Sequence, residues 1–328
     1  MNIVVTTGDC NGIGIEVLLH ALQSESLRRA FSKIRIQIAT NPETFAMYAQ
    51  MIGVDLSLDD GDVLLDGYRY QVLPCSTIAP VQFGAEDDAA GALAYEALER
   101  AVTAWYDGTA DAIVTMPVSK TTLHRAGFTY PGQTEFFAAK AGVGNPLMIL
   151  CHENVRVALA TIHEPLAAVP ALLSAEMLCE RISLFRYSLL QDFGCARPRI
   201  AVLGCNPHAG ENGHIGREEI EIIQPAVSRM REMGMIVDGP FAADGFFAHG
   251  EYKNYDGILA MYHDQGLIPL KLLAQGAGVN VTAGLPIVRT SPDHGTAFAL
   301  AGKNMADPRS TVQAMIQAVE IVQNRHRS

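Results

Sequence analysis

Residues 1–22 read MNIVVTTGDCNGIGIEVLLHAL, and this stretch decides the fold class. A short β-branched run, Ile3–Thr7, leads through a glycine-rich turn into an amphipathic segment, Ile15–Leu22. A strand, a turn and a helix in this order form the first half of a βαβ unit, which places the next strand parallel to the first. The stretch therefore predicts an α/β fold built on a largely parallel sheet.

The same alternation continues along the chain. Short β-branched or apolar runs predict six further strands: Ile34–Thr40, Ala112–Thr115, Leu147–Cys151, Val155–Ala160, Ile200–Gly204 and Gly257–Met261. Longer amphipathic segments predict four further helices: Ala89–Tyr106, Ala175–Leu190, Glu218–Met233 and Ser310–Asn324. We expect antiparallel pairing at two places, for Tyr68–Leu73 and for the closely spaced pair Leu147–Cys151 and Val155–Ala160.

Composition limits the partners of the chain. Its 328 residues include 24 Lys and Arg against 35 Asp and Glu, a net charge of −11, and this acidic surface excludes nucleic acid as an expected partner. The six cysteines form no CxxC pair, which is typical of free thiols in a reducing compartment. No stretch reaches the roughly 18 apolar residues of a membrane helix. We therefore expect a cytoplasmic protein that binds no membrane.

Three histidines follow strand candidates. His163 comes after Val155–Ala160, and His208 and His263 come after the strands predicted at 200–204 and 257–261. In open α/β sheets, ligands bind outside the carboxyl ends of the strands. Three imidazoles at this edge would bind a divalent ion with open coordination positions, and Asp264 would support them. A purely structural role for each histidine is the alternative, and the pattern alone leaves both open.

A second group of polar residues suits an anionic substrate. Lys271, Asn280 and Arg289 supply two cations and an amide among apolar residues and glycines, which favours a pocket over solvent-exposed loop cations. Thr134 is predicted to be the N-cap of a helix. The glycines of the first turn fit neither GxGxxG nor a P-loop, so an anion cradle and a tight turn without a ligand remain equally open there.

These clusters together resemble a known family. The segments Asn206-Pro207-His208-Ala209-Gly210-Glu211 and Tyr262-His263-Asp264-Gln265-Gly266, with Arg289-Thr290-Ser291 and Asp293-His294-Gly295, form a highly specific set. On these residues the chain is similar to the 4-hydroxythreonine-4-phosphate dehydrogenase family of vitamin B6 biosynthesis, and the resemblance covers nearly the whole chain.

The resemblance implies two α/β/α subdomains with a cleft between them, related to isocitrate and isopropylmalate dehydrogenases. We expect the first subdomain to comprise residues 1–135 and 265–328, and the second to comprise residues 136–264. The resemblance also implies an obligate homodimer whose active sites draw residues from both chains.

The resemblance further implies a reaction. NAD, or NADP, would oxidise the secondary alcohol of 4-phosphohydroxy-L-threonine with the help of Zn, Co, Mn or Mg, and the β-keto acid would lose carbon dioxide to give 3-amino-2-oxopropyl phosphate. The implied metal ligands are His163, His208 and His263. The implied substrate contacts are Gln133, Thr134, Lys271, Asn280 and Arg289. Two side chains are candidates for the general base, Asp244 and Lys271.

One position departs from the family pattern. Gly132-Gln133-Thr134-Glu135 stands where the family usually has Gly-His-Thr-Glu. The glutamine removes a titratable donor, and this favours as an alternative a related dehydrogenase acting on a phosphorylated four-carbon sugar acid or a dihydrodiol carboxylate. Two other classes also stay open, a three-histidine metal hydrolase and a catalytically inactive dimeric binding protein.

Overall fold

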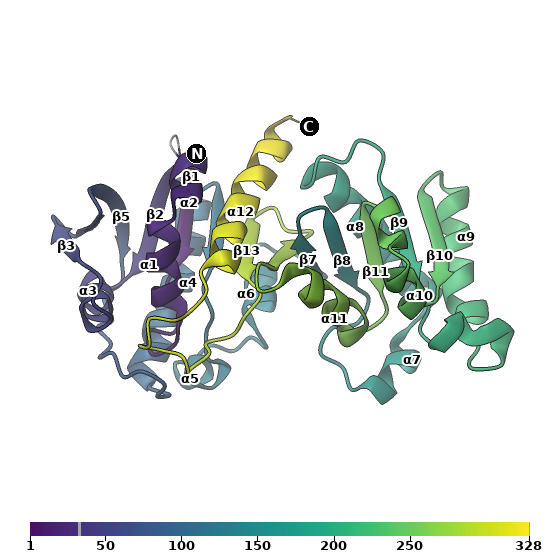
Figure 1. The fold of residues 1–328 in the computed structure, drawn as a ribbon, viewed down its shortest axis with the longest axis horizontal. Coiled ribbons are helices and arrows are strands. Elements are labelled where there is room, and N and C mark those ends of the chain that lie inside the picture. Colours follow the sequence, from purple (N-terminus) through teal and green to yellow (C-terminus); the bar gives the residue numbers. More distant parts are fainter. Residues whose placement is uncertain (32–33, 328) are drawn as a thin grey trace. The chain divides into compact units, whose positions relative to one another are not determined.

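The computed structural model describes residues 1–31 and 34–327. The chain forms two compact units, unit 1 (Met1–Gly144 and Leu285–Val322) and unit 2 (Asn145–Gly284 and Gln323–Ser328). In each unit helices flank a sheet whose strands are mostly parallel (Figure 1). The predicted fold class, α/β with two subdomains, is confirmed.

Unit 1 contains seven strands among the described residues: β1 (Asn2–Thr6), β2 (Arg35–Thr40), β3 (Leu56–Asp59), β4 (Asp62–Leu65), β5 (Tyr68–Pro74), β6 (Ala112–Thr115) and β13 (Val288–Pro292). Its helices are α1 (Gly14–Gln23), α2 (Glu25–Ala30), α3 (Pro42–Met51), α4 (Asp88–Tyr106), α5 (Lys120–Arg125), α6 (Gln133–Lys140) and most of α12 (Arg309–Arg327).

The sheet of unit 1 has the strand order β13-β6-β1-β2-β5-β4-β3. The strands from β13 to β5 are parallel, and β4 and β3 continue the sheet in antiparallel fashion. From β1 the chain passes through α1 to β2, and from β5 it passes through α4 to β6. These two crossovers run in opposite directions along the sheet. Because parallel crossovers are right-handed, these two helices cover opposite faces of the sheet (Figure 1).

Unit 2 contains six strands among the described residues: β7 (Leu147–His152), β8 (Val155–Leu159), β9 (Arg199–Leu203), β10 (Ile236–Phe241), β11 (Gly257–Ala260) and β12 (Val279–Ala283). Its helices are α7 (Val169–Leu172), α8 (Ala175–Gln191), α9 (Gln224–Glu232), α10 (Ala243–Ala248) and α11 (His263–Ala274). Shorter helical turns are η1 (Leu166–Ala168), η2 (Pro207–Gly213), η3 (Glu219–Ile223) and η4 (Glu251–Asn254).

The sheet of unit 2 has the strand order β10-β9-β11-β8-β7-β12. The first four strands are parallel, and β7 pairs antiparallel with both of its neighbours. By the same handedness rule, α8 and α9 lie on one face and α10 and α11 on the other. The carboxyl ends of β8, β11 and β9 therefore lie side by side at one edge of the sheet.

The core of unit 2 lies directly beneath this edge. Leu159, Leu203 and Ala260 of the three strands pack with Leu267 and Leu270 of α11 in one buried cluster. Gly266 lets α11 approach the sheet closely, since a Cβ at this position would lie 2.7 Å from a methyl carbon of Val157. The helix that begins at His263 is thus fixed on the strands that lead to the other two histidines.

Most of the predicted elements are present, including all seven strands and the antiparallel β7–β8 hairpin. The antiparallel prediction for Tyr68–Leu73 is wrong on one side, because β5 pairs parallel with β2 and antiparallel only with β4. The division into units also differs from the one expected. Its second boundary lies at Gly284 rather than at residue 264, because α11 and β12 pack on β7 and β8 of unit 2.

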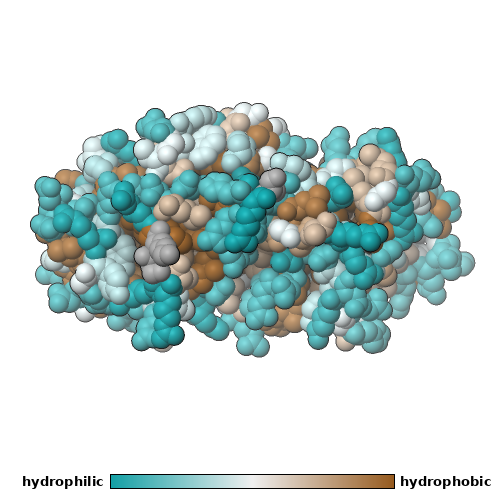
Figure 2. Space-filling model, turned by 90° about the horizontal axis from the view of Figure 1, so that it is seen from above, coloured by the Kyte–Doolittle hydropathy of each residue, from teal (hydrophilic) through white to brown (hydrophobic). Residues whose placement is uncertain are grey.

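The surface and the cysteines match an ordinary globular protein. On the face drawn in Figure 2, hydrophilic residues predominate and hydrophobic ones form local patches. All six cysteines are free thiols, and Cys10, Cys75 and Cys151 are buried. Burial raises the pKa of each of these three thiols to about 12. Among the described helices, none is both long enough and apolar enough to cross a membrane.

Candidate active site

The three predicted histidines follow three neighbouring parallel strands of unit 2. His163 comes four residues after β8, His263 begins α11 shortly after β11, and His208 lies in the turn that follows β9. Because β11 lies between β8 and β9, all three chain segments leave the same edge of one sheet. The structure therefore confirms the predicted placement of these histidines at strand ends.

Hydrogen bonds continue beyond the strands and hold these segments together. Thr161 donates from its backbone N–H and from its hydroxyl to the carbonyl of Met261, at 3.2 and 2.7 Å. The side chain of Gln265 accepts from the N–H of Met261 at 2.7 Å and donates to the carbonyl of Gly204 at 2.6 Å. Gln265 thus joins the end of β11 to the start of the His208 turn.

The rings of His163 and His263 lie 5.8 Å apart between centroids, with 38° between their planes. Nδ1 of His263 lies 2.7 Å from a carboxylate oxygen of Asp264, the arrangement that orients an imidazole toward a metal through its other nitrogen. Imidazole donors at an open edge fit a divalent cation chemically. Within one chain, however, no three His, Cys, Asp or Glu side chains of the described residues gather as a metal site.

His208 lies in an unusual backbone conformation. Every residue from His208 to Gly213 has a positive φ, between 42° and 90°, so the turn is left-handed throughout. In this conformation a side chain crowds the following carbonyl, at a cost of roughly 1–2 kcal/mol for each residue that carries a Cβ. Four of the six residues carry one. Successive residues of this kind persist only where the surrounding structure holds them.

The other predicted residues of unit 2 are spread around the same sheet. Asp244 lies in the first turn of α10, which follows β10, the neighbour of β9. Lys271 lies in the last turn of α11, about 12 Å along the helix axis from His263. Asn280 is half-buried on β12, and its Oδ1 is a buried acceptor without a hydrogen-bond partner among the described residues. Such an orphaned oxygen suits a ligand contact.

Unit 1 supplies the remaining predicted residues, centred on Arg289. This residue lies on β13 and is only 4% exposed. Its guanidinium donates to the hydroxyl of Thr115 through Nε and Nη2, at 3.1 and 2.7 Å, and to Oε1 of Gln133 at 3.2 Å. It also lies 5.9 Å from the centre of the Phe137 ring. Burial lowers the pKa of Arg289 to about 10, and nearby Glu135 partly offsets this effect. Such a buried cation is well suited to bind an anion.

Thr134 does not cap α6, so that prediction is wrong. The helix begins at Gln133, and its N-cap is Gly132, whose backbone is extended. Gln133 turns its side chain back, so that Nε2 donates to the carbonyl of Met116 at 3.2 Å. The N-cap prediction failed because Gly132 takes the cap position, two residues before Thr134. Gln133 and Thr134 therefore both lie in the first turn of α6.

The glycine-rich turn between β1 and α1 is filled by the protein itself. A Cβ on Gly8 would lie 2.2 Å from the carbonyl oxygen of Pro117, and one on Gly12 would lie 2.7 Å from that of Thr296. Asp9 accepts from Thr122 at 3.1 Å, and its burial raises its pKa. These close approaches indicate that the glycine-rich segment is a tight turn without a ligand rather than an anion cradle.

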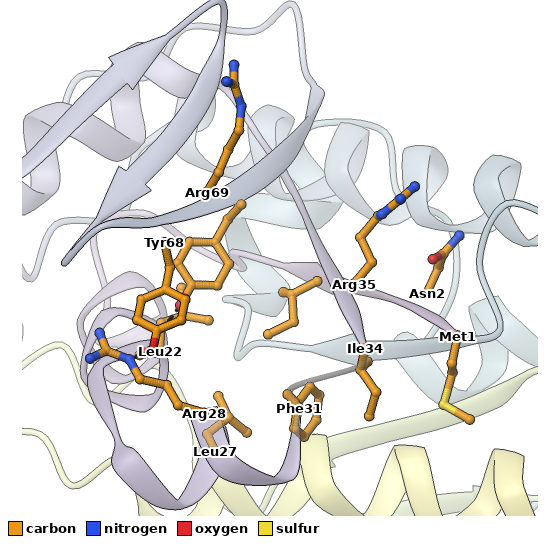
Figure 3. A pocket seen from close by; sticks show the side chains of 12 residues that line it. Met1, Asn2, Leu22, Leu27, Arg28, Phe31, Ile34, Arg35, Tyr68 and Arg69 are labelled. Atoms are coloured by element: carbon orange, nitrogen blue, oxygen red, sulfur yellow. Dashed lines mark hydrogen bonds between the residues drawn. The ribbon is translucent and has the colours of Figure 1, made fainter.

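A cavity of unit 1, whose lining is drawn in Figure 3, is lined by none of the predicted site residues. It has a volume of about 540 Å³ and lies at the amino ends of β1, β2 and β5, opposite the edge at which ligands bind in such sheets. Two arginines on its lining form ion pairs at the surface, Arg28 with Asp66 and Arg69 with Asp59. We assign it no part in the site.

Sequence reasoning missed several residues that hold the site. Thr115, Gln265 and Glu219 each receive or donate hydrogen bonds to the predicted residues or to their turns. Gln265 stands within the quoted Tyr262–Gly266 motif, two residues after His263, and this proximity was the available signal. Glu219 lies eleven positions after His208, and nothing in the sequence connects the two.

Comparisons with known proteins show the family of the chain. The sequence model of the family described as "Pyridoxal phosphate biosynthetic protein PdxA" matches residues 18–318. A 4-hydroxythreonine-4-phosphate dehydrogenase of Bacteroides thetaiotaomicron is 43% identical, over 100% of this chain and 90% of its own length. The solved structure of a 4-hydroxythreonine-4-phosphate dehydrogenase of Klebsiella pneumoniae is 36% identical, covers 98% of this chain and 99% of its own, and superimposes with a TM-score of 0.84.

A second kind of dehydrogenase shares the fold at lower similarity. The solved terephthalate 1,2-cis-dihydrodiol dehydrogenase of Burkholderia xenovorans is 28% identical, covers 98% of both chains, and superimposes with a TM-score of 0.64.

Proposed function

The chain belongs to the family of PdxA pyridoxal phosphate biosynthetic proteins and is a dehydrogenase acting on a hydroxyl group, and from this premise we propose that it oxidises 4-phosphohydroxy-L-threonine. The β-keto acid so formed loses carbon dioxide to give 3-amino-2-oxopropyl phosphate. The named relatives are dehydrogenases, so neither a metal hydrolase nor an inactive binding protein is retained.

One observation carries the proposal. His163, His208 and His263 each follow one of three neighbouring strands, at a single edge of the sheet of unit 2. A purely structural role would not require all three histidines to lie at one edge. We infer that His163, His208 and His263 bind one divalent cation, whose chemistry when bound is to favour the alkoxide and later the enolate of the substrate. Imidazole ligands suit zinc and cobalt best, and manganese and magnesium, which prefer oxygen ligands, are further candidates.

The chain's own residues position the substrate. Arg289 and Lys271 neutralise phosphate and carboxylate charge, and Gln133, Thr134 and Asn280 donate or accept hydrogen bonds. NAD or NADP accepts the hydride from the carbinol carbon. A general base removes the hydroxyl proton, and Asp244 and Lys271 are the candidates. The carbon–carbon bond to the carboxylate then breaks, and its electron pair takes up a proton.

We propose that the active protein is a homodimer with shared sites. The exposed face of α11 supports this, because Ile268 is 57% exposed and Leu272, one turn further, is 73% exposed. Adjacent large apolar side chains on one helix face suit burial against a second copy. The same helix begins with His263, so a dimer through this face would bring that histidine close to a second chain.

Gln133 supports a second candidate substrate class. The glutamine stands at the position where the family usually has a histidine, and a dihydrodiol dehydrogenase is among the solved structures with this fold. Under this candidate, the chain oxidises a dihydrodiol carboxylate or a phosphorylated four-carbon sugar acid instead.

A substrate panel tests the proposal. Purified protein is offered 4-phosphohydroxy-L-threonine, a phosphorylated four-carbon hydroxy acid and a dihydrodiol dicarboxylate, with NAD or NADP and with each of the four metals. We expect absorbance of reduced nicotinamide only with the first substrate, and its loss after chelation. Turnover of another substrate alone would contradict the assignment.

A further inference from the structure

Glu219 lies beneath the left-handed turn that carries His208. The residue is only 3% exposed, although it stands in the short helical turn η3, in which Glu221 and Ile220 are exposed. Oε1 accepts from the backbone N–H groups of Cys205 and Asn206, both at 2.7 Å. Oε2 accepts from the side-chain Nδ2 of Asn206 at 3.0 Å. All three donors directly precede Pro207 and His208.

The same carboxylate also touches the middle of the turn. A Cβ on Gly210 would lie 2.4 Å from Oε2 of Glu219, so the backbone passes directly over the oxygen. The neighbouring Glu218 contributes, because its Oε2 accepts from Nδ2 of Asn206 at 2.6 Å. Both carboxylates thus hold the side chain of Asn206, which directly precedes the turn. Glu219 also holds the main chain of Cys205 and Asn206.

We propose that Glu219 is a positioning residue that holds the His208 turn in the conformation that binds the metal. The proposal rests on the proposed function, in which His208 is a metal ligand. The left-handed turn is unfavourable in isolation and needs an external brace, and Glu219 is the buried group that contacts both its start and its middle. Hydrogen bonds to a carboxylate are stronger than those to a neutral acceptor.

Glu219→Gln changes this brace with little change in volume. A glutamine keeps one acceptor oxygen for the two backbone N–H groups, but its NH₂ group then faces Nδ2 of Asn206, and two donors cannot bond to each other. Glu221→Gln is the matched control. Glu221 lies in the same helical turn, is 56% exposed at its side chain, and pairs with Arg217 at the surface.

The experiment uses full-length protein stripped of metal by a chelator. Zn²⁺ binding is measured by calorimetry, and the visible absorption of bound Co²⁺ reports the ligand set. Hydrogen exchange is followed at the backbone amides of residues 205, 206 and 208–213. For Glu219→Gln we expect zinc binding about 10–100-fold weaker, an altered Co²⁺ spectrum and faster exchange at Cys205 and Asn206. Glu221→Gln should match the wild type in all three.

The controls separate the two levels of inference. If His208→Ala binds zinc as tightly as the wild type, the metal assignment itself is wrong. If His208→Ala loses binding while Glu219→Gln behaves like Glu221→Gln, only the brace is wrong. Should Glu219→Gln fail to fold, Asn206→Ala decides, since it removes the Nδ2 bonds and leaves Glu219 in place. We expect it to weaken zinc binding several-fold, and unchanged binding would overturn the proposal.

Discussion

Oε1 of Gln133 accepts a hydrogen bond from Nη2 of Arg289 across 3.2 Å. The amide is thus a neutral partner of a buried cation whose pKa burial lowers to about 10. A histidine at position 133 would stand beside the same guanidinium. Its charged form would be repelled there unless a bound anion lay between the two groups. A charged histidine at position 133 would therefore be favourable beside Arg289 only with an anion bound.

Gln133→His tests the choice of substrate. With 4-phosphohydroxy-L-threonine, the histidine gains a proton as the anion binds, and this should strengthen binding by about 1–2 kcal/mol, most visibly at mildly acidic pH. Steady-state kinetics should show a lower KM and little change in kcat. If the wild type instead oxidises another hydroxy acid and the variant loses that activity, Gln133 determines specificity and the related-dehydrogenase candidate holds.

Replacing His208 tests the metal site. Zinc at about 100 times its Kd should stabilise the wild type by about 2.7 kcal/mol, which thermal or urea unfolding measures. His208→Ala should lose this stabilisation together with turnover. His214→Ala is the control, because His214 is exposed and directly follows the same turn. Full activity of chelator-treated His208→Ala would show that the three-histidine site is wrong.

Mixed dimers test whether two chains share one site. His208→Ala is paired with His263→Ala, because the two histidines lie on separate elements, the turn η2 and the helix α11. If each site takes His208 from one chain and His263 from the other, every mixed dimer holds one intact site. Equal mixing should restore about a quarter of the wild-type activity. Two inactive variants that stay inactive after unfolding and refolding together would argue against shared sites.

The two candidates for the general base differ in position. Asp244 lies at the strand-end edge near His208, whereas Lys271 lies at the far end of α11 from His263. We expect Asp244→Asn to lower kcat by about 10²–10⁴-fold and to remove the rise of kcat with pH. Lys271→Met should mainly raise KM through the loss of an anion contact. The reverse pattern in the two pH profiles would assign the base to Lys271.

Glu96 on α4 predicts a dependence of stability on pH. Burial alone would raise its pKa, but hydrogen bonds from the N–H groups and hydroxyls of Ser76 and Thr77 lower it to about 2. The carboxylate therefore stabilises unit 1 above the unfolded pKa of about 4.3, and this stabilisation is lost as the pH falls toward 2.

Glu96→Gln should accordingly cost about 2 kcal/mol of unfolding free energy at pH 7, after allowance for partial exposure. The difference from the wild type should shrink steadily between pH 5 and pH 2 in urea titrations. Glu99→Gln, on the same helix, serves for comparison, since Glu99 pairs with Lys140 instead. A difference that stays constant over this pH range would contradict the assignment.

The sequence allowed prediction of what depends on local pattern. Strand ends were visible as β-branched or apolar runs that end a few residues before His163, His208 and His263, and the sheet edge beside these histidines followed from the expected topology. The brace from Glu219 was not visible, because it depends on a left-handed backbone that the residues themselves disfavour. Similarly, the unit boundary at Gly284 depends on the packing of α11 and β12, which no change in composition marks.

Unit 1 is built from two separate segments of the chain, and this affects the protein while it is being translated. β6 lies between β1 and β13, and β13 leaves the ribosome only after the segment Asn145–Gly284 of unit 2 has been translated. At about 5–20 residues per second, the nascent chain exposes an unpaired edge of β6 for roughly 10–30 seconds. Open edges recruit other strands, so β6 of the unfinished chain is where nascent polypeptides would associate and where a chaperone would have to act.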